Sequence, residues 1–248
     1  MNKLISIILF GLFLTGCQAT TLQMRVDENT KQYSKINDPT YGKVHSFEFG
    51  SECGDLKRNS QGSKNYVGKW HDSDCGQNSV RSEISQNSSH QPKESWYRWN
   101  VFLPKDFPIQ EGGKLLLGQF HNGECPHVSF TSGGRDEGTI YFETMKTWQG
   151  DCASTTRIPF TSIQKLKGKW TEFVMYSRWE NNQDGRFVIY LDGVQVIDYK
   201  GRTLTKGKEK VNYVKVGIYQ CCNEGYNIKP ASALFTTPER SSESFLPN

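Results

Sequence analysis

Three short stretches of the chain each place reactive side chains on one face of a predicted strand. Side chains alternate between the two faces of a strand, so positions two apart point the same way. In the stretches 80–85, 114–121 and 212–220, one face is mainly apolar and the other carries charged, amide, imidazole or phenol groups. In chain order these polar side chains are Arg81 and Glu83, then Gln119 and His121, then Tyr213, Lys215 and Tyr219.

These groups can move protons and hold anions if the three strands are neighbours in one sheet. An unperturbed histidine titrates at about 6.5 and a tyrosine at about 10, so His121 is a ready base and Tyr219 a ready acid. Tyr219 would act as a base only if nearby cations stabilised its phenolate. The cations and the amide together suit an anionic polymer lying in a groove across the sheet.

The elements that must position these groups read as strands throughout. Asp184-Gly185 and Asp192-Gly193 are hairpin turn signals on either side of the alternating stretch 186–191, which predicts a meander. With 23 glycines in 248 residues and few helix-length periodic segments, the chain is predicted to form one all-β domain. The other predicted strands are 44–49, 96–103, 139–143 and 170–179, whereas 50–79 reads as loops and 221–248 as a polar tail.

Three motifs, in this order, resemble those of the β-jelly-roll polysaccharide lyases. They are Arg81-Ser82-Glu83, Gln119-Phe120-His121 and Tyr213-x-Lys215-x-Gly217-x-Tyr219-Gln220, and the jelly-roll alginate lyases share them. The surrounding sequence is more similar to the heparin lyase I and glucuronan lyase group. That similarity lies in Trp96-Tyr97-Arg98-Trp99, Leu103-Pro104-Lys105-Asp106-Phe107-Pro108 and Gly168-Lys169-Trp170. The resemblance runs from about Gly42 to Tyr219.

The resemblance implies a β-jelly roll, which is a concanavalin A-like sandwich of two antiparallel sheets with a concave substrate groove. It also implies β-elimination on an anionic polysaccharide that contains uronic acid, of the alginate, glucuronan or glycosaminoglycan type. This chemistry removes the C5 proton of the uronate and expels the oxygen on C4. No cofactor is required for it. Relatives in the group can carry structural calcium, but no run of carboxylates in this sequence identifies such a site.

The motifs imply catalytic roles for four residues of this chain. Gln119 and Arg81 match the positions that neutralise the uronate carboxylate, which makes the C5 proton acidic enough to remove. His121 and Tyr219 match the base and the acid that must flank the sugar ring. Which of these two takes the proton stays open.

Three further residues are expected to bind substrate. Lys215 matches a functional lysine of the heparin lyase group and could hold a carboxylate or a sulfate, although a solvated sheet-edge lysine is the alternative. Glu83 is expected to orient Arg81, and Tyr213 to pack or to stack on a sugar.

Two other functions stay open on the sequence. A non-catalytic carbohydrate-binding lipoprotein on the same sandwich would need stacking aromatics and hydrogen bonds, but no acid and base. A glycoside hydrolase normally needs two carboxylates about 5 Å or about 6.5 to 9.5 Å apart. Glu143 and Glu172 are available, but no paired pattern on one strand marks them. The net charge of +4 indicates a mild bias toward anionic partners and not a nucleic-acid-binding surface.

The first 16 residues predict a lipoprotein signal peptide. Lys3 precedes an apolar run that is too short to span a bilayer permanently, and the ending Leu14-Thr15-Gly16-Cys17 resembles a bacterial lipobox. We therefore expect lipidation at Cys17 and membrane attachment through that anchor, and Gln18 favours the outer membrane. Residues 17–41 are expected to form a polar tether, and residues 42–248 the lyase domain, as a monomer.

Export would place the six other cysteines in an oxidising compartment, where disulfides are the default. We expect two bridges, Cys53–Cys75 and Cys125–Cys152. The adjacent Cys221 and Cys222 would then either bridge each other or form separate links. A zinc site is the weaker alternative, because no two cysteines have the two-residue spacing of a zinc knuckle.

Overall fold

The computed structural model describes residues 19–27, 30, 32–50, 56–58, 64–66, 79–110, 113–133, 138–148, 151–221 and 228–247. The predicted signal peptide, the predicted lipidation site Cys17 and the predicted Cys53–Cys75 bridge lie outside these residues, as does Cys222. No helix in the described part of the chain is both long and apolar enough to cross a membrane.

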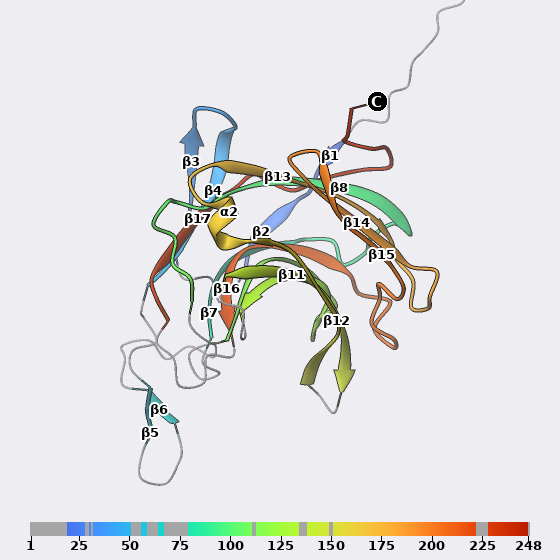
Figure 1. The fold of residues 1–248 in the computed structure, drawn as a ribbon, viewed down its shortest axis with the longest axis horizontal. Coiled ribbons are helices and arrows are strands. Elements are labelled where there is room, and N and C mark those ends of the chain that lie inside the picture. The colour runs from blue at the N-terminus through green and yellow to red at the C-terminus, as the bar shows by residue number, and fades with distance from the viewer. Residues whose placement is uncertain are drawn as a thin grey trace, which may run out of the picture.

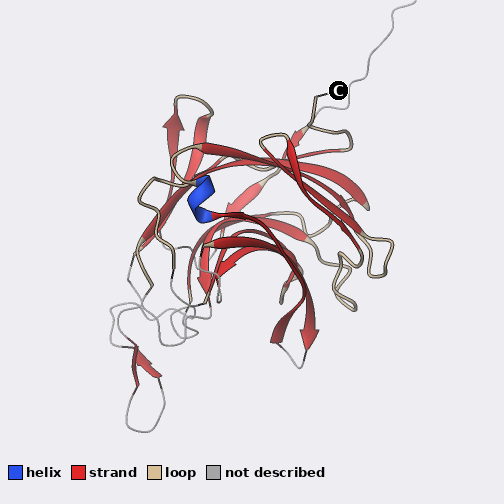
Figure 2. Cartoon of the chain, viewed as in Figure 1, coloured by secondary structure: helices blue, strands red, loops and turns tan. Residues whose placement is uncertain are grey.

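Two antiparallel sheets lie face to face (Figure 1), and strands dominate the chain (Figure 2). Within the described residues, one sheet has nine strands and its main path is β15-β14-β13-β8-β17-β4-β3. Their bounds are β15 Val194–Lys200, β14 Arg186–Leu191, β13 Trp170–Arg178, β8 Glu94–Phe102, β17 Ala231–Phe235, β4 Gly42–Phe49 and β3 Gln32–Asp38. The two remaining strands, β1 (Thr20–Thr21) and β18 (Glu239–Ser241), pair with each other, and β18 also pairs with β8.

The second sheet has seven strands among the described residues, in the order β12-β11-β10-β9-β16-β7-β2. It curves strongly between β7 and β12, so that its face away from the other sheet is concave (Figure 1). The bounds are β12 Asp151–Ser162, β11 Thr139–Trp148, β10 Pro126–Gly133, β9 Lys114–His121, β16 Tyr213–Cys221, β7 Val80–Gln86 and β2 Met24–Val26. A separate hairpin pairs β5 (Leu56–Arg58) with β6 (Lys64–Tyr66), and α2 (Ile163–Leu166) follows β12.

Aromatic side chains fill the space between the two sheets. Trp99 of β8 is 1% exposed, and its ring centroid lies 6.4 Å from Phe120, 6.1 Å from Phe130 and 6.5 Å from Phe173. Rings of this size remove large apolar areas from water, which is the main favourable term in folding. The jelly-roll sandwich predicted from the sequence is therefore confirmed as the fold.

The predicted meander is also confirmed. β13, β14 and β15 pair in succession, with Phe173 opposite Leu191 and Ile189 opposite Ile197. Asp192 and Gly193, which join β14 to β15, have φ angles of 48° and 79°. Positive φ at both central residues is typical of a type I′ turn, whose twist matches the flanking strands.

The two ends of the domain differ from the prediction, because strands extend into both the predicted tether and the predicted polar tail. β2 and β3 lie in residues 17–41, before the boundary at Gly42. Both are outermost in their sheets, where one edge faces water. β2 is only three residues long and β3 is mostly polar, so neither showed the apolar alternation of a core strand. β17 lies in the middle of the nine-stranded sheet, and the small buried Ala231 and Ala233 leave only a weak strand pattern.

The predicted Cys125–Cys152 disulfide is confirmed, with 5.6 Å between the two Cα atoms. It connects the end of the loop between β9 and β10 to the start of β12, across 27 residues of sequence. The bridge therefore restrains the loop that follows His121 against an outermost strand of the same sheet.

Gly217 in β16 allows β7 to approach more closely than any side chain would permit. Its φ is +139°, and a Cβ atom there would lie 2.3 Å from the Ser82 carbonyl oxygen and 2.7 Å from the Glu83 Cα. The pairing of β16 with β9 also shifts between Val216 and Tyr219, which marks a bulge at this point. The glycine thus determines where Glu83 lies beneath the row of polar side chains.

We predict that Gly217→Ala lowers the free energy of unfolding by about 3 kcal/mol, because backbone strain and a clash with backbone atoms act together. Gly207→Ala is the matched control, since Gly207 also has a positive φ, of +83°, but nothing within 4 Å of its Cβ position. It should cost only about 1 kcal/mol. Urea unfolding of both variants measures the difference, and equal losses would contradict the role given to Gly217.

Candidate active site

The structure brings the three reactive stretches together, because β9, β16 and β7 are adjacent in the seven-stranded sheet. Lys215 lies opposite Gln119 on one side, and Tyr219 lies opposite Arg81 on the other. Tyr213 lies opposite His121. The polar row of β16 therefore runs between the polar faces of its two neighbours, as the alternation predicts.

Glu83 is the buried centre of this cluster, with only 1% of its surface exposed. Its Oε1 accepts a hydrogen bond of 2.9 Å from the Gln119 amide. Its Oε2 lies 3.1 Å from the Lys215 ammonium and 3.8 Å from the Arg81 guanidinium. One carboxylate thus positions an amide and two cations from three strands, including Arg81, which it was expected to orient.

Lys215 is also buried, at 3% exposed, and its ammonium lies between two carboxylates. It contacts Asp27 Oδ2 at 2.9 Å in addition to Glu83. Burial alone lowers the pKa of a lysine, but Glu83 and Asp27 outweigh it and leave the pKa of Lys215 raised. Lys215 therefore stays charged, and its ammonium is directed into the protein toward these two carboxylates.

A more exposed layer lies over these buried groups and lines a groove of about 370 Å³. The Arg81 guanidinium lies over the Tyr219 ring, 4.2 Å from its centroid, at a distance that favours a cation–π contact. Gln119 and His121 line the same groove, although Gln119 is only 2% exposed. All four residues that the sequence nominated for catalysis therefore face one hollow, whereas Glu83, Lys215 and Tyr213 are not among its lining residues.

The hydrogen bonds of His121 determine which of its nitrogens carries the proton. The backbone N–H of Gly123 donates to His121 Nδ1 at 2.9 Å, and the Tyr213 hydroxyl lies 3.0 Å from the same atom. Burial, with Lys215 and Arg81 nearby, lowers the pKa of His121 to about 3. The ring is therefore neutral near pH 7, with Nδ1 as an acceptor and the proton on Nε2.

Sequence reasoning missed two contributors to the site. Asp27 follows β2 in the predicted tether, where nothing distinguishes it from the surrounding polar residues. Gly123 acts through its backbone N–H, which every residue except proline has, so its residue type does not reveal this role. Only the fold, which places β2 beside β7 and folds the loop after β9 back onto His121, identifies them.

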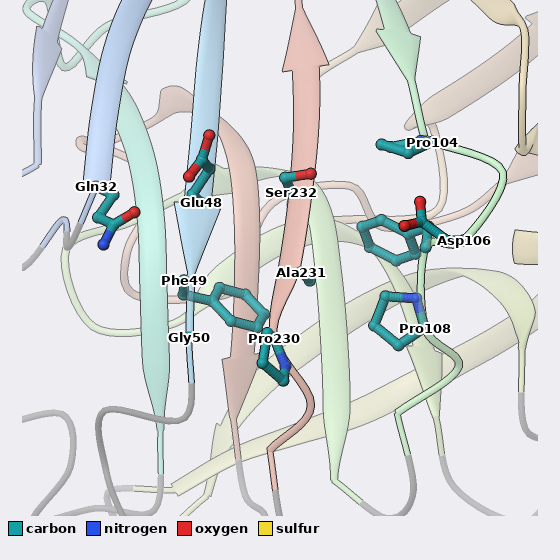
Figure 3. Close-up of a pocket in the computed structure, with 11 residues that line it drawn as sticks. Gln32, Glu48, Phe49, Gly50, Pro104, Asp106, Pro108, Pro230, Ala231 and Ser232 are labelled. Carbon is teal, nitrogen blue, oxygen red and sulfur yellow. The ribbon is translucent and has the colours of Figure 1, made fainter.

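Neither the two glutamates considered for a glycosidase nor the pocket in Figure 3 offers a site for an anionic polymer comparable to the groove. Glu143 lies on β11 of the seven-stranded sheet and Glu172 on β13 of the nine-stranded sheet, so they cannot act as a glycosidase pair. The pocket in Figure 3, at the ends of β4 and β17, is lined by the carboxylates Glu48 and Asp106 and by no lysine, arginine or histidine. No group of His, Cys, Asp or Glu within the described ranges fits a metal ion.

We predict that the protein loses stability as the pH falls from about 6.5 to about 5. Burial lowers the pKa of His45 and His127 to about 4 and that of His121 to about 3. Below the unfolded value of about 6.5, the unfolded chain binds protons that the folded chain does not, so unfolding becomes easier by roughly 1 kcal/mol per histidine and pH unit.

Urea unfolding at several pH values measures this loss, with His127→Gln as the matched variant. Glutamine can accept from the Thr205 N–H and donate to the Val211 carbonyl as His127 does, but it does not titrate. The variant should lose about a third of the pH dependence, since each of the three histidines contributes similarly. A wild type whose stability is constant over this range would contradict the prediction.

The comparisons with known proteins agree with this geometry. The fold is similar to the crystal structure of an endo-β-1,4-glucuronan lyase from the fungus Trichoderma reesei (TM-score 0.64, 15% identity, covering 93% of this chain and 92% of that chain). It is also similar to alginate lyase A1-II′ (TM-score 0.51, 17% identity, 86% and 85% covered) and to alginate lyase vAL-1 from Chlorella virus (TM-score 0.50, 14% identity, 90% and 93% covered).

At these identities the structures establish the fold alone, and comparison with curated proteins found no match. The sequence profile described as polysaccharide lyase matches residues 17–237, which is most of the chain. The chain therefore belongs to the polysaccharide lyase family.

Proposed function

We propose that this lyase cleaves an anionic polysaccharide containing uronic acid by β-elimination in the groove of the seven-stranded sheet. The observation that carries the proposal is the arrangement of Arg81, Gln119, His121 and Tyr219 around one hollow, above a buried carboxylate that positions two of them. The similar structures named as glucuronan and alginate lyases act on polyuronates, which supports the same substrate class for this chain.

The reaction begins with neutralisation of the uronate carboxylate. Gln119 and Arg81 line the groove with an amide and a guanidinium, and both are positioned by Glu83. Hydrogen bonds and positive charge at the carboxylate stabilise the negative charge that develops when the C5 proton leaves. The electrons of the C5–H bond then form the C4=C5 double bond, and the C4–O bond breaks with its electron pair on the leaving oxygen.

We assign both proton transfers to Tyr219. His121 has its Nδ1 occupied by the Gly123 N–H, so its Nε2–H can donate a hydrogen bond to the substrate but cannot accept the C5 proton. Tyr219 can take that proton as a phenolate and then return it to the leaving oxygen. Arg81, at 4.2 Å from the ring centroid, stabilises negative charge on Tyr219 while the proton is transferred.

The attachment of the protein to a membrane is a second part of the proposal. We infer lipidation at Cys17 from the lipobox-like ending and a location at the outer membrane from Gln18. We infer a monomer because the groove and its buried cluster are complete within one chain. The steps above use only side chains and backbone groups of this chain.

We predict that the purified protein generates an unsaturated product from at least one polyuronate. Mixing it with alginate, polyglucuronate or heparin should raise the ultraviolet absorbance of the C4=C5 double bond, because β-elimination leaves that bond in the product. No rise on any of the three, with binding retained, would contradict the proposed function and favour a binding protein. Reducing sugar released without absorbance would indicate hydrolysis.

We further predict that Tyr219→Phe lowers kcat by on the order of a thousandfold, because the phenyl ring packs similarly but cannot transfer a proton. His121→Gln should be at least about tenfold more active than His121→Ala, since glutamine keeps a hydrogen-bond donor. Initial rates from the absorbance assay give both ratios, and circular dichroism checks the fold. If His121→Gln and His121→Ala are equally inactive, His121 and not Tyr219 is the base.

A further inference from the structure

A second buried carboxylate on the concave face of the seven-stranded sheet holds two cations of its own. Glu143 of β11 has no exposed surface, and its two oxygens bind different partners. The Lys114 ammonium lies 3.0 Å from Oε2, and the Arg157 side chain lies 2.9 Å from Oε1. The Ser154 hydroxyl donates to Oε2 at 3.1 Å. The mechanism above uses none of these residues.

This cluster differs from the one around Glu83 in its charge. At Glu83, the cations Arg81 and Lys215 are matched by two carboxylates, Glu83 and Asp27. At Glu143, two cations contact a single carboxylate, and about a third of each cationic side chain is exposed. Among the described residues, the Glu143 cluster therefore has one more cation than it has carboxylates, and this excess positive charge can bind an anion.

The position of Lys114 places that charge beside the reacting groups. Lys114 lines the same groove as Arg81 and Tyr219. Tyr219 lies opposite Leu116, and Lys114 lies two residues further along that face of β9, which is roughly 7 Å at about 3.3 Å per residue. A step of this size is comparable to one sugar unit of a polysaccharide.

The groove near Lys114 also contains one carboxylate, which could repel an anion. Glu124 also lines the groove and brings negative charge to it, but Lys208 pairs with that carboxylate. Within the described ranges, the groove-lining carboxylate that could oppose the attraction of Lys114 and Arg157 for an anion is thus already paired with a cation.

We propose that Lys114 and Arg157 bind the acid group of the sugar next to the one that reacts. This inference rests on the proposed function. Glu143 holds the two cations in place, as Glu83 holds Arg81. The enzyme then selects polymers in which consecutive sugars carry an acid group, over polymers in which a uronate alternates with a neutral sugar.

The test is the Lys114→Gln variant, assayed on the polyuronate that the wild type cleaves. KM should rise on the order of tenfold with little change in kcat, because the lost charge-assisted contact is made equally in the ground and transition states. Lys114→Arg keeps the charge and should keep a KM close to that of the wild type. Lys200→Gln is the matched control, because Lys200 is exposed on β15 of the opposite sheet.

Arg157→Gln is a second, independent variant, since Lys114 and Ser154 still pair with Glu143 when it is changed. Arg157→Gln should raise KM in the same way. If Lys114→Gln does not fold, Arg157→Gln alone tests the inference. Unchanged KM in the folded variants, or a fall in kcat at unchanged KM, would overturn the inference while leaving the proposed function intact.

Binding measured by calorimetry distinguishes a failure of the proposed lyase function from a failure of the proposed Lys114 subsite. If the wild type yields no unsaturated product, the proposed function fails. The second subsite is then tested by titrating polyglucuronate into the wild type and into Lys114→Gln. Weaker binding by the variant supports the subsite, and equal binding overturns it.

Discussion

The burial of Glu83 is the constraint on which the candidate site depends. A carboxylate that is 1% exposed is stable only if cations and hydrogen-bond donors surround it, and here they come from β9 and β16 as well as from β7 itself. Lys215 and Arg81 cannot move away from Glu83 freely, because the buried carboxylate would then lose the positive charge that compensates it. The cluster is thus a rigid base that fixes Gln119 and Arg81 at the groove surface before a substrate arrives, as electrostatic catalysis requires.

The site has two layers with different tasks. Glu83, Lys215 and Asp27 form an almost fully internal layer, whereas Arg81 and Tyr219 form a surface layer that can touch a sugar. The sequence places Lys215 and Tyr219 on the same face of β16, but the structure separates them by depth. The backbone approach at Gly217 allows this, since β7 lies close enough there for Glu83 to reach beneath the row.

Much of the fold and part of the site could be predicted from the sequence, because alternation is a local property. It identified β7, β9 and β16 and the reactive face of each, and the Asp-Gly turns identified the meander of β13 to β15. Family resemblance added the roles of Arg81 and Tyr219. Partners that come from distant strands could not be predicted in this way. Asp27 reaches Lys215 only because β2 pairs with β7, and Glu143 meets Lys114 only because β10 lies between their strands. Burial likewise depends on what covers a strand, so the depth of Lys215 could not be read from its neighbours in sequence.

The place of β17 in the nine-stranded sheet has a consequence for the order in which the protein can fold. β17, formed by residues 231–235, inserts between β8 and β4, and the first described strand, β1, pairs with the last, β18. Neither contact can form until nearly the whole chain is available, and contacts this distant in sequence slow folding. A nascent chain therefore cannot complete the nine-stranded sheet until β17 and β18 have been synthesised. Such a delay would suit the membrane location proposed above, which requires the chain to pass through a translocation channel before it acquires its structure.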